Sequence, residues 1–337
     1  MKKLFETVAK NVKDGHALVL VNVIASSGST PRGAGATMLV FEDGHSEGTI
    51  GGGAVEYEAQ KQAAGLFKEK NSKLLSYTLK PNDVADLGMI CGGSVTVYYQ
   101  YIDPEDQKTV DLFLYIAESF GREQSAWLLR RIQNGVLTGM GVYDDNGLHF
   151  LEDAPIEQIK PILQSGSEML PGDPAYYIEP LTRAGRVYIF GGGHVAQELV
   201  PVISHIGFTT VVFEDREAFA DKKLFKGAAG VVLGRFDQIA DYITIRPEDY
   251  VIIMTRGHQA DFEVLRQTLR TQATYIGCIG SRKKVEAVKK RLIEDGISLA
   301  DCNRMRSPIG LEIKAETPAE IAVSIAAELI LHRAEIA

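Results

Sequence analysis

Residues 186–216 read RVYIFGGGHVAQELVPVISHIGFTTVVFEDR, and this stretch decides the fold of the second half of the chain. It begins with an apolar run suited to a buried strand and continues through a glycine turn into an amphipathic helical segment. A second β-rich run follows and ends in acids. A strand, a helix and a second strand in this order form a βαβ unit, in which the two strands lie parallel. We therefore expect a parallel sheet that starts near residue 186.

The glycine turn has the residue spacing of turns that bind phosphate. Gly191, Gly193 and Ala196 follow the pattern GxGxxG/A. The first glycine permits the tight turn, the second lets a phosphate approach the backbone, and the alanine lets the helix pack closely on the sheet. The amide groups at the start of the helix would face the anion. This spacing inside a complete βαβ unit predicts a Rossmann-like fold, although a fold alone does not determine function.

Three further residues bear on what this unit binds. Glu214 and Asp215 lie 18 and 19 residues after Ala196, where an acid often binds the ribose hydroxyls of NAD. His194, inside the turn, is placed either to stack on a base or only to cover the turn. The unit therefore predicts NAD or another nucleotide as ligand, and the alternative is a turn that packs the helix without any ligand.

Beyond this unit, strands and helical stretches alternate, which indicates a parallel sheet with right-handed crossovers. Thr317 and Pro318 begin a final helix predicted over 318–332, since threonine is a good N-cap and proline fits the first helical position. We expect the strands at 187–190, 209–213, 230–233, 250–254 and 275–279.

The first half of the chain predicts mixed helices and strands, with glycines at the junctions. Asp145, Asn146 and Gly147 form a good hairpin turn. The run YYIEPL, residues 176–181, is expected to close the same sheet. Helical patterns lie at 4–13, 54–68 and 110–133, and strands are predicted at 16–25, 37–41, 46–50, 74–79 and 94–101.

The chain is therefore assigned to the α/β class with two domains. Residues 1–182 form an N-terminal mixed α+β domain, with a motif core at 1–105 that is extended by a helix and a hairpin. Residues 183–337 form a C-terminal Rossmann-like parallel-sheet domain. The boundary is expected near 182–185.

The composition is that of an ordinary globular protein, with 337 residues, 45% hydrophobic and 24% charged. The formal net charge is −8 and no dense run of Lys and Arg is present, which argues against nucleic acid as a partner. No apolar stretch approaches the roughly 18 residues of a membrane span, and the first residues lack the apolar core of a signal peptide. We expect a cytoplasmic protein without membrane contact.

The three cysteines, Cys91, Cys278 and Cys302, are widely spaced. An odd number at such spacing argues against a disulfide framework and against a CxxC metal site. We expect Cys278 and Cys302 to be buried structural residues.

Short segments in both halves form a recognisable set: GSTPR (28–32), Gly35-Ala36, GTIGGGAVE (48–56), CGG (91–93), IFGGGHVAQ (189–197), IGCIGSRKK (276–284), SPIGL (307–311) and AETPAEIAVSI (315–325). Together they resemble the XdhC/CoxI family, the accessory proteins of molybdenum hydroxylases such as xanthine dehydrogenase. The resemblance covers nearly the whole chain. One segment departs, because Arg256 and Gly257 stand where many relatives carry a His-Asp-like pair, so no role is assigned to His258.

The resemblance implies a protein that handles the molybdenum cofactor, molybdopterin. It would bind the cofactor, protect it while a cysteine desulfurase replaces a terminal oxo ligand with sulfur, and deliver it to an apo xanthine dehydrogenase in purine catabolism. The apo hydroxylase and the desulfurase would be its partners, and a homodimer is the usual expectation. A maturation factor without turnover of its own is thus implied, rather than an enzyme. The chain also lacks a cysteine set for the iron–sulfur clusters of the hydroxylase itself.

Molybdopterin carries a phosphate, a pterin and a metal-binding dithiolene, so a carrier needs groups for an anion. Arg32 in the first motif is either a guanidinium that holds phosphate bidentately or an ordinary surface charge. Gly51, Gly52 and Gly53 precede a predicted helix, where their amides could form an anion nest. The alternative for this triple glycine is a tight turn without a ligand.

Cys91, with Gly92 and Gly93, is the candidate for metal chemistry. A thiolate beside glycines can be approached closely, and soft sulfur suits molybdenum ligation or a persulfide relay. We therefore expect Cys91 to be a molybdenum ligand in a cofactor-binding loop, the alternative being an inert buried cysteine. No residue is assigned as catalytic.

A second anion site is predicted after the strand at 275–279. Gly280, Ser281 and Arg282 bring amides, a hydroxyl and a positive side chain together, whereas the alternative is a solvated helix face. The SPIGL loop is expected near the same carboxyl edge of the sheet.

Two other functions remain open. One is an NAD-dependent oxidoreductase that uses the Rossmann unit, although no residue set has the features of a hydride-transfer acid–base pair with a substrate clamp. The other is a stoichiometric, non-catalytic subunit of a xanthine dehydrogenase complex.

Overall fold

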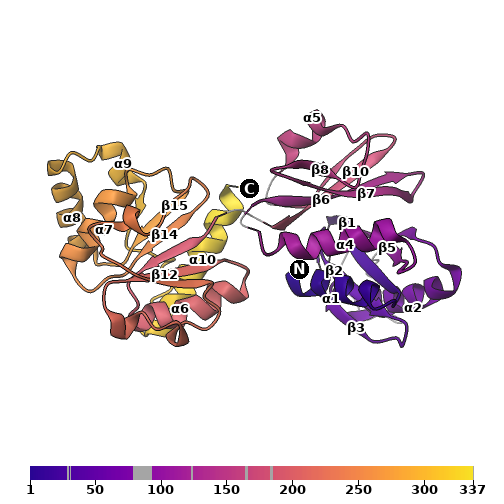
Figure 1. Ribbon diagram of the computed structural model, residues 1–337, viewed down its shortest axis with the longest axis horizontal. Helices are drawn as coiled ribbons and strands as arrows, with labels where there is room; N and C mark the ends of the chain where they lie inside the picture. Colours follow the sequence, from indigo (N-terminus) through magenta and orange to yellow (C-terminus); the bar gives the residue numbers. More distant parts are fainter. Residues whose placement is uncertain are drawn as a thin grey trace. The chain divides into compact units, whose positions relative to one another are not determined.

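The structure of the chain is a computed structural model that describes residues 1–28, 30, 32–78, 93–122, 124–163, 166–182 and 185–336, without the side chains of 282–284. The chain divides into two compact units, Met1–Arg183 and Ala184–Ala337. Figure 1 shows the elements of both units, coloured along the sequence, and we describe each unit by itself.

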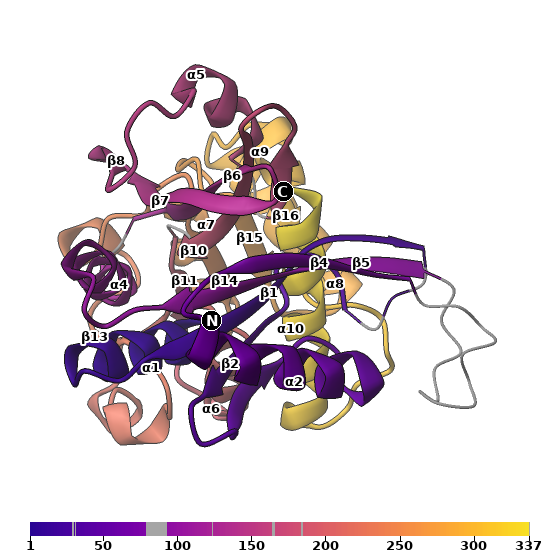
Figure 2. The ribbon, with the colours of Figure 1, turned by 90° about the vertical axis from the view of Figure 1, so that its right-hand side faces the viewer.

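The first sheet of unit 1 is antiparallel and carries the glycine-rich segments of the first half. Its central strand β1 (Leu18–Gly28) pairs with β2 (Thr37–Phe41) on one side and with β5 (Gly93–Ile102) on the other. Helix α2 (Gly53–Glu69) covers one face of this sheet, where its apolar side packs on Val19 and Val21 (Figure 2). The strands follow the order β3 (Ser46–Thr49), β2 (Thr37–Phe41), β1 (Leu18–Gly28), β5 (Gly93–Ile102) and β4 (Lys73–Thr78).

A second antiparallel sheet fills the rest of unit 1, and it corrects one expectation. The helix predicted over 110–133 is wrong in its second half, because α4 (Gln107–Ser119) ends early and a strand follows. A short apolar run such as Trp127-Leu128-Leu129 fits a helix or a buried strand equally well. The run at 176–181 belongs to this sheet, which also contains the hairpin that turns at 145–147. The order is β8 (Gly147–His149), β7 (Val136–Asp144), β6 (Ala126–Gln133), β10 (Ala175–Thr182) and β9 (Glu168–Leu170).

The two sheets of unit 1 share a hydrophobic core. Helices α1 (Lys2–Lys13) and α4 pack together and contribute to a cluster that contains Leu20 of the first sheet and Leu128 of the second. Leu129, the next residue, lies on the other face of the second sheet, which the short helix α5 (Ile156–Ile159) covers. Unit 1 is therefore layered as α2, the first sheet, a layer that contains α1 and α4, the second sheet and α5.

A buried polar network links the two sheets. Arg130 Nη1 donates to Glu179 Oε1 at 2.6 Å, and both side chains are at most 1% exposed. Asn22, on β1, donates its amide Nδ2 to Glu179 Oε2 at 3.4 Å and to Thr37 Oγ1 at 2.8 Å. Thr37 in turn donates to the carbonyl of Gly35 at 3.0 Å. The network thus reaches from the second sheet to the glycine-rich segment before β2.

Unit 2 is a six-stranded parallel sheet, which confirms the Rossmann-like prediction. Taken in chain order, its strands lie in the spatial order 3-2-1-4-5-6 that is typical of dinucleotide-binding folds. The strands follow the order β13 (Gly230–Leu233), β12 (Thr210–Glu214), β11 (Val187–Phe190), β14 (Tyr250–Ile253), β15 (Tyr275–Cys278) and β16 (Met305–Arg306).

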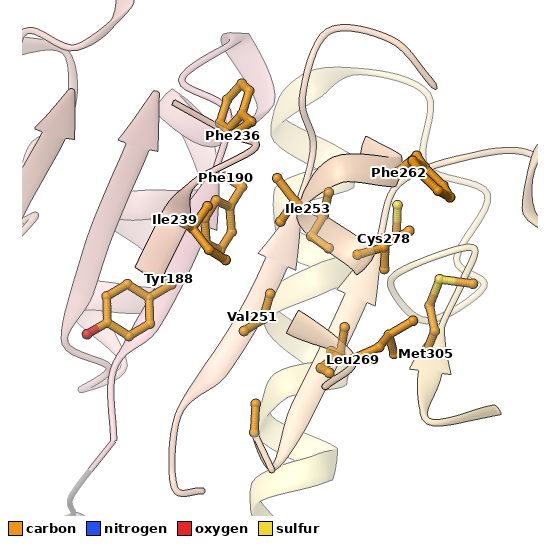
Figure 3. Packing of buried hydrophobic residues seen from close by; sticks show 14 of the residues in the cluster. Tyr188, Phe190, Phe236, Ile239, Val251, Ile253, Phe262, Leu269, Cys278 and Met305 are labelled. Carbon is orange, nitrogen blue, oxygen red and sulfur yellow. The ribbon is translucent and has the colours of Figure 1, made fainter. Parts of the chain in front are cut away.

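Helices cover both faces of the parallel sheet. Helices α6 (His194–His205) and α10 (Pro318–Glu335) pack on Ile189 and Ile252. The opposite face, shown in Figure 3, includes Phe190, Ile253 and Cys278. Because neighbouring residues of each strand serve opposite cores, the strands have continuous apolar sequences. The helices on this second face are α7 (His258–Thr268), α8 (Arg282–Glu294) and α9 (Leu299–Asn303).

Two connections of unit 2 differ from the alternation that the sequence predicts. The helices expected after β12 and after β13 are wrong, since those connections contain 3₁₀ turns at 217–219, 222–224 and 239–241. Their few apolar residues, such as Phe225 and Phe236, pack singly on the sheet and do not form a helical stripe.

The final helix begins as predicted. Thr317 caps α10, and Glu320 completes a capping box with it. Among the described residues no helix, the 18-residue α10 included, is long and apolar enough to cross a membrane.

The Arg130–Glu179 pair yields a prediction of stability. Glu179→Leu leaves the Arg130 charge buried without its partner, so we expect the free energy of unfolding to fall by about 3–5 kcal/mol in urea denaturation. The double variant Arg130→Met/Glu179→Leu removes both charges and should regain most of that loss. Asp237→Leu breaks an exposed pair, whose side chains are 63% and 42% exposed, and should leave the free energy of unfolding nearly unchanged. A double variant as unstable as Glu179→Leu would contradict this account.

Candidate functional site

The topology of the first sheet brings the glycine-rich segments of unit 1 to one edge. Gly28 at the end of β1 pairs with Gly93 at the start of β5, and Thr78 at the end of β4 pairs with Ser94. Thr49 at the end of β3 pairs with the first residue of β2. The segments that follow β1, β3 and β4 therefore leave the sheet in the same direction, with β3 ending level with Asn22 and β1 extending six residues farther. We call this end of the sheet the glycine edge. It is the candidate cofactor site of unit 1.

Arg32 lies in the exposed segment between β1 and β2. Thr30 Oγ1 donates to the backbone carbonyl of Arg32 at 3.2 Å, which fixes the local turn. Within the described ranges no carboxylate forms an ion pair with the Arg32 guanidinium, so its donors are available to an anion.

Cys91 and Gly92 lie outside the described residues, so the metal ligand stays a prediction. Gly93 is the first residue of β5. The hydroxyls of Ser27 and Ser94 are 2.8 Å apart and hydrogen-bonded. The strand that Cys91 precedes is thereby joined to the end of β1, next to the segment that carries Arg32.

The triple glycine forms the turn from β3 into α2. Gly51, Gly52 and Gly53 have φ angles of +130°, +73° and +61°, a region that disfavours any side chain. The amide of Gly51 donates to Thr49 Oγ1 at 3.0 Å, and the amide of Gly52 donates to Glu56 Oε2 at 3.1 Å. Two amides of the predicted anion nest are therefore already used by side chains of the chain itself.

Glu56 is a candidate site residue that the sequence prediction missed. Its Oε2 also accepts from the amide of Ile50 at 3.0 Å and from Thr49 Oγ1 at 2.5 Å. Partial burial by itself would raise the pKa of Glu56, but the hydrogen bonds from Thr49 and from the amides of Gly52 and Ile50 hold that pKa below its usual value. An acid in the first turn of a predicted helix is the signal that could have identified it.

The glycine turn of unit 2 is also closely packed. Gly191 has a φ angle of +108°, and a Cβ atom there would lie 2.5 Å from the carbonyl oxygen of Met254. Gly193 is the N-cap of α6, and a Cβ atom there would meet no other atom within 4 Å. His194, the first residue of α6, is exposed. The open side of the turn thus lies at Gly193 and His194.

The acid predicted to bind a ribose is engaged with the protein. Glu214 is 1% exposed, and its Oε2 accepts from the amide of Gly192 at 2.6 Å. Arg216 donates its Nε to Oε1 at 2.9 Å and its Nη2 to Oε2 at 3.0 Å. Burial would raise the pKa of Glu214, but the hydrogen bonds from Arg216 and from the Gly192 amide lower it to about 2.

Asp215 has charged partners as well. Burial and the neighbouring Glu214 raise the pKa of Asp215. Its Oδ2 lies 3.9 Å from Arg256 Nη2 and its Oδ1 lies 3.7 Å from Arg216 Nε. Asp215 follows β12 and Arg256 follows β14, so this contact joins the ends of the two strands that flank β11. Arg256 belongs to the segment where the chain departs from the family pattern.

The remaining predicted residues of unit 2 lie at the carboxyl ends of β15 and β16. Gly280 and Ser281 connect β15 to α8, whose first residue is Arg282, with its side chain outside the described part. Ser307 in the SPIGL loop donates its Oγ to the carbonyl of Cys278 at 2.7 Å, which places this loop at the same edge as predicted.

The two described cysteines are buried, as expected. Cys278 and Cys302 lie in the hydrophobic cluster beneath α7 and α8. Figure 3 shows Cys278 near Phe262 and Ile253. Burial raises the pKa of Cys302, which disfavours the thiolate.

The structure adds Asp261, which the sequence prediction did not select, to the carboxyl edge of unit 2. Its carboxylate is fully buried in the first turn of α7. Oδ1 accepts from Thr255 Oγ1 at 2.6 Å and from the Thr255 amide at 3.2 Å. The sequence signal that could have identified Asp261 is an acidic residue on the apolar side of a predicted helix, because acids are seldom buried unless they have a partner.

The depressed pKa of Glu214 predicts a pH dependence. Its folded-state pKa of about 2 lies below the unfolded value of about 4.3, so its stabilisation is complete above pH 4.5 and is lost as the pH falls toward 2. We expect Glu214→Gln to lower the free energy of unfolding by on the order of 3 kcal/mol at pH 7, and by much less at pH 2.5. Urea denaturation across this range tests it, with Glu198→Gln on the exposed side of α6 as control. If the loss of unfolding free energy caused by Glu214→Gln does not change with pH, the stabilisation does not come from the ionised Glu214 carboxylate.

Comparisons with known proteins cover both units. The model of the XdhC and CoxI family matches residues 12–78, and the model of the XdhC Rossmann domain matches residues 187–329. The first match contains Arg32 and the triple glycine, and the second contains the glycine turn of unit 2.

Relatives align along nearly the whole chain. The chain is 26% identical to a probable xanthine dehydrogenase subunit of Bacillus subtilis, with 97% of this chain and 96% of that protein aligned. It is 22% identical to the molybdenum cofactor insertion chaperone PaoD of Escherichia coli, over 95% of this chain and 86% of that protein. The crystal structure of a xanthine dehydrogenase from Bacillus halodurans is similar with a TM-score of 0.83 at 27% identity, covering 99% of this chain and 96% of that one. With one family's models on both units and relatives aligned from end to end, the chain belongs to the XdhC and CoxI family.

Proposed function

We propose that the protein is an accessory factor of a xanthine dehydrogenase-type molybdenum hydroxylase, which binds the molybdenum cofactor and inserts it into the apo hydroxylase. The observation that carries this proposal is the alignment, along 95% of the chain, with a relative named as a molybdenum cofactor insertion chaperone. The relative named as a xanthine dehydrogenase subunit supports the choice of hydroxylase. The protein would act by binding and transfer, without turnover of its own.

The residues at the glycine edge fit parts of this cargo. Arg32, exposed and without an ion-pair partner among the described residues, offers the planar donors that phosphate binds best. The chain that carries Cys91 joins β5 at the same edge, so its thiolate is the soft ligand we propose for the molybdenum. In unit 2, the open side of the turn at Gly193 is the proposed position for a second anionic group.

The proposal includes partners that the cargo requires. A cysteine desulfurase would supply the sulfur while the cofactor is held, and the apo hydroxylase would receive the sulfurated cofactor. We also propose that the protein is a homodimer in the cytoplasm and serves purine catabolism. Light scattering of the purified protein measures whether it is a homodimer.

Two other functions are distinguished by one binding experiment. The purified protein is mixed with molybdenum cofactor and, separately, with NAD, and the bound ligand is measured by dialysis, with the fluorescent pterin as readout for the cofactor. Selective binding of the cofactor supports the proposal. Selective NAD binding together with dehydrogenase activity would instead favour an oxidoreductase. Persistent co-purification with the hydroxylase would favour a stoichiometric subunit.

Cys91 provides the first functional prediction. In an assay that supplies apo hydroxylase, cofactor and a sulfur source, we expect Cys91→Ala to lose maturation of the hydroxylase, because the soft ligand is gone. Circular dichroism checks that the variant is folded. Normal maturation by Cys91→Ala would remove the cysteine from the proposed site.

Arg32 provides the second functional prediction. Arg32→Ala should weaken binding of the cofactor about tenfold, because a charge-assisted hydrogen bond to phosphate contributes about 1.5–3 kcal/mol. The loss should shrink as the salt concentration rises. Lys61→Ala removes the same charge from the exposed side of α2 and should leave the affinity unchanged. Equal losses in the two variants would indicate a general charge effect and no phosphate contact.

A further inference from the structure

We propose that Glu56 recognises the donor edge of a 2-amino-4-oxopyrimidine ring, the edge that presents an N–H and an NH₂ group in a pterin. This inference rests on the proposed function, in which the cargo contains a pterin, and it assigns one contact of that cargo to one side chain. Guanine has the same donor edge, so the test includes both sources.

The two oxygens of Glu56 have different roles. Oε2 accepts the hydroxyl of Thr49 and the amides of Ile50 and Gly52, so three internal donors fix the carboxylate in place. Oε1 accepts no hydrogen bond within the described ranges, and the side chain is only partly buried. One oxygen is thus an anchor, and the other is presented outward in a fixed position.

The chemistry of that outward oxygen selects a donor. An ionised carboxylate only accepts hydrogen bonds, and the internal donors keep Glu56 ionised. Among the described residues no Lys or Arg forms an ion pair with Glu56, so its negative charge is not neutralised by a neighbour. A phosphate would be repelled here, whereas an N–H and NH₂ pair would gain charge-assisted hydrogen bonds.

An aromatic side chain lies on the same helical turn. Tyr57 is 69% exposed, which is unusual for a ring of this size. Exposed aromatic rings at binding sites commonly stack on planar heterocycles. Consecutive residues of a helix point about 100° apart, so Tyr57 offers an aromatic surface on the adjoining side of α2 and does not face Glu56.

The ligand series tests the contact without changing the fold. Pterin is compared with lumazine, in which an oxo group replaces the 2-amino group, and guanosine is compared with xanthosine, which differs in the same way. Binding to the full-length protein is measured by fluorescence for the pteridines and by calorimetry for the nucleosides. We expect pterin to bind at least tenfold more tightly than lumazine. If the protein prefers guanosine over xanthosine but does not prefer pterin over lumazine, Glu56 still recognises the donor edge, and the ligand that carries this edge is a nucleotide.

The variant Glu56→Gln sharpens the test. The internal donors should hold the amide oxygen of the glutamine inward, so its NH₂ group faces the ligand and the outward acceptor becomes a donor. We therefore expect the preference for pterin over lumazine to disappear or reverse. Glu58→Gln changes the same residue type on α2, at a carboxylate that accepts from Gln62, and should keep the preference.

The outcomes separate this inference from the proposed function. Two results would overturn the role of Glu56. One is that the unchanged protein binds pterin and lumazine equally and shows no preference for guanosine over xanthosine. The other is that the preference for pterin over lumazine survives in Glu56→Gln. Binding of intact molybdenum cofactor with no measurable binding of either pterin or guanosine would overturn it too, while the proposed function stands. Failure to bind the intact cofactor at all would reject the proposed function itself.

Discussion

In each unit a carboxylate of the chain occupies the amide groups of a glycine turn. Glu56 accepts from Gly52 in unit 1, and Glu214 accepts from Gly192 in unit 2. Turns with positive φ angles point several backbone N–H groups at one place, and a buried N–H without an acceptor costs about 1–3 kcal/mol. Glu56 and Glu214 supply the acceptors for these N–H groups. They also decide which donors and acceptors remain for a ligand, so the chemistry of both candidate sites depends on them.

The two acids differ in what surrounds them, and this difference separates a structural role from a binding role. Glu214 is buried, and Arg216 binds both of its oxygens. Its hydrogen-bonding capacity is used, and a ribose would have to displace an arginine. Glu56 has one engaged oxygen and is partly exposed. The glycine turn of unit 2, which by sequence has the clearest ligand motif, is therefore the more closed of the two.

The fold of unit 2 could be predicted because its strands are buried on both faces and their continuous apolar runs have no competing interpretation. Unit 1 could be predicted only in part. The run that forms β6 contains Arg130, whose charge is unexpected inside a sheet and is tolerated only because Glu179 lies on the neighbouring strand β10. That partner is 49 residues away, so local periodicity could not reveal it. The 3₁₀ connections after β12 and β13 were missed because a regular alternation was assumed where the apolar residues are too few for a helix.

The candidate site shows the same division between local and distant information. Sequence spacing identified the turns and Arg32, whereas their meeting at one edge follows from antiparallel pairing between distant strands. The amides of the triple glycine were expected to bind an anion, and the acceptor that uses them comes from the next helical turn. As a result the glycine edge carries a cation at Arg32 and an anion at Glu56, and neither neutralises the other within the described residues. On the proposed function, Arg32 would hold the phosphate of the cofactor and Glu56 the donor edge of its pterin, because the two side chains offer contacts of opposite sign.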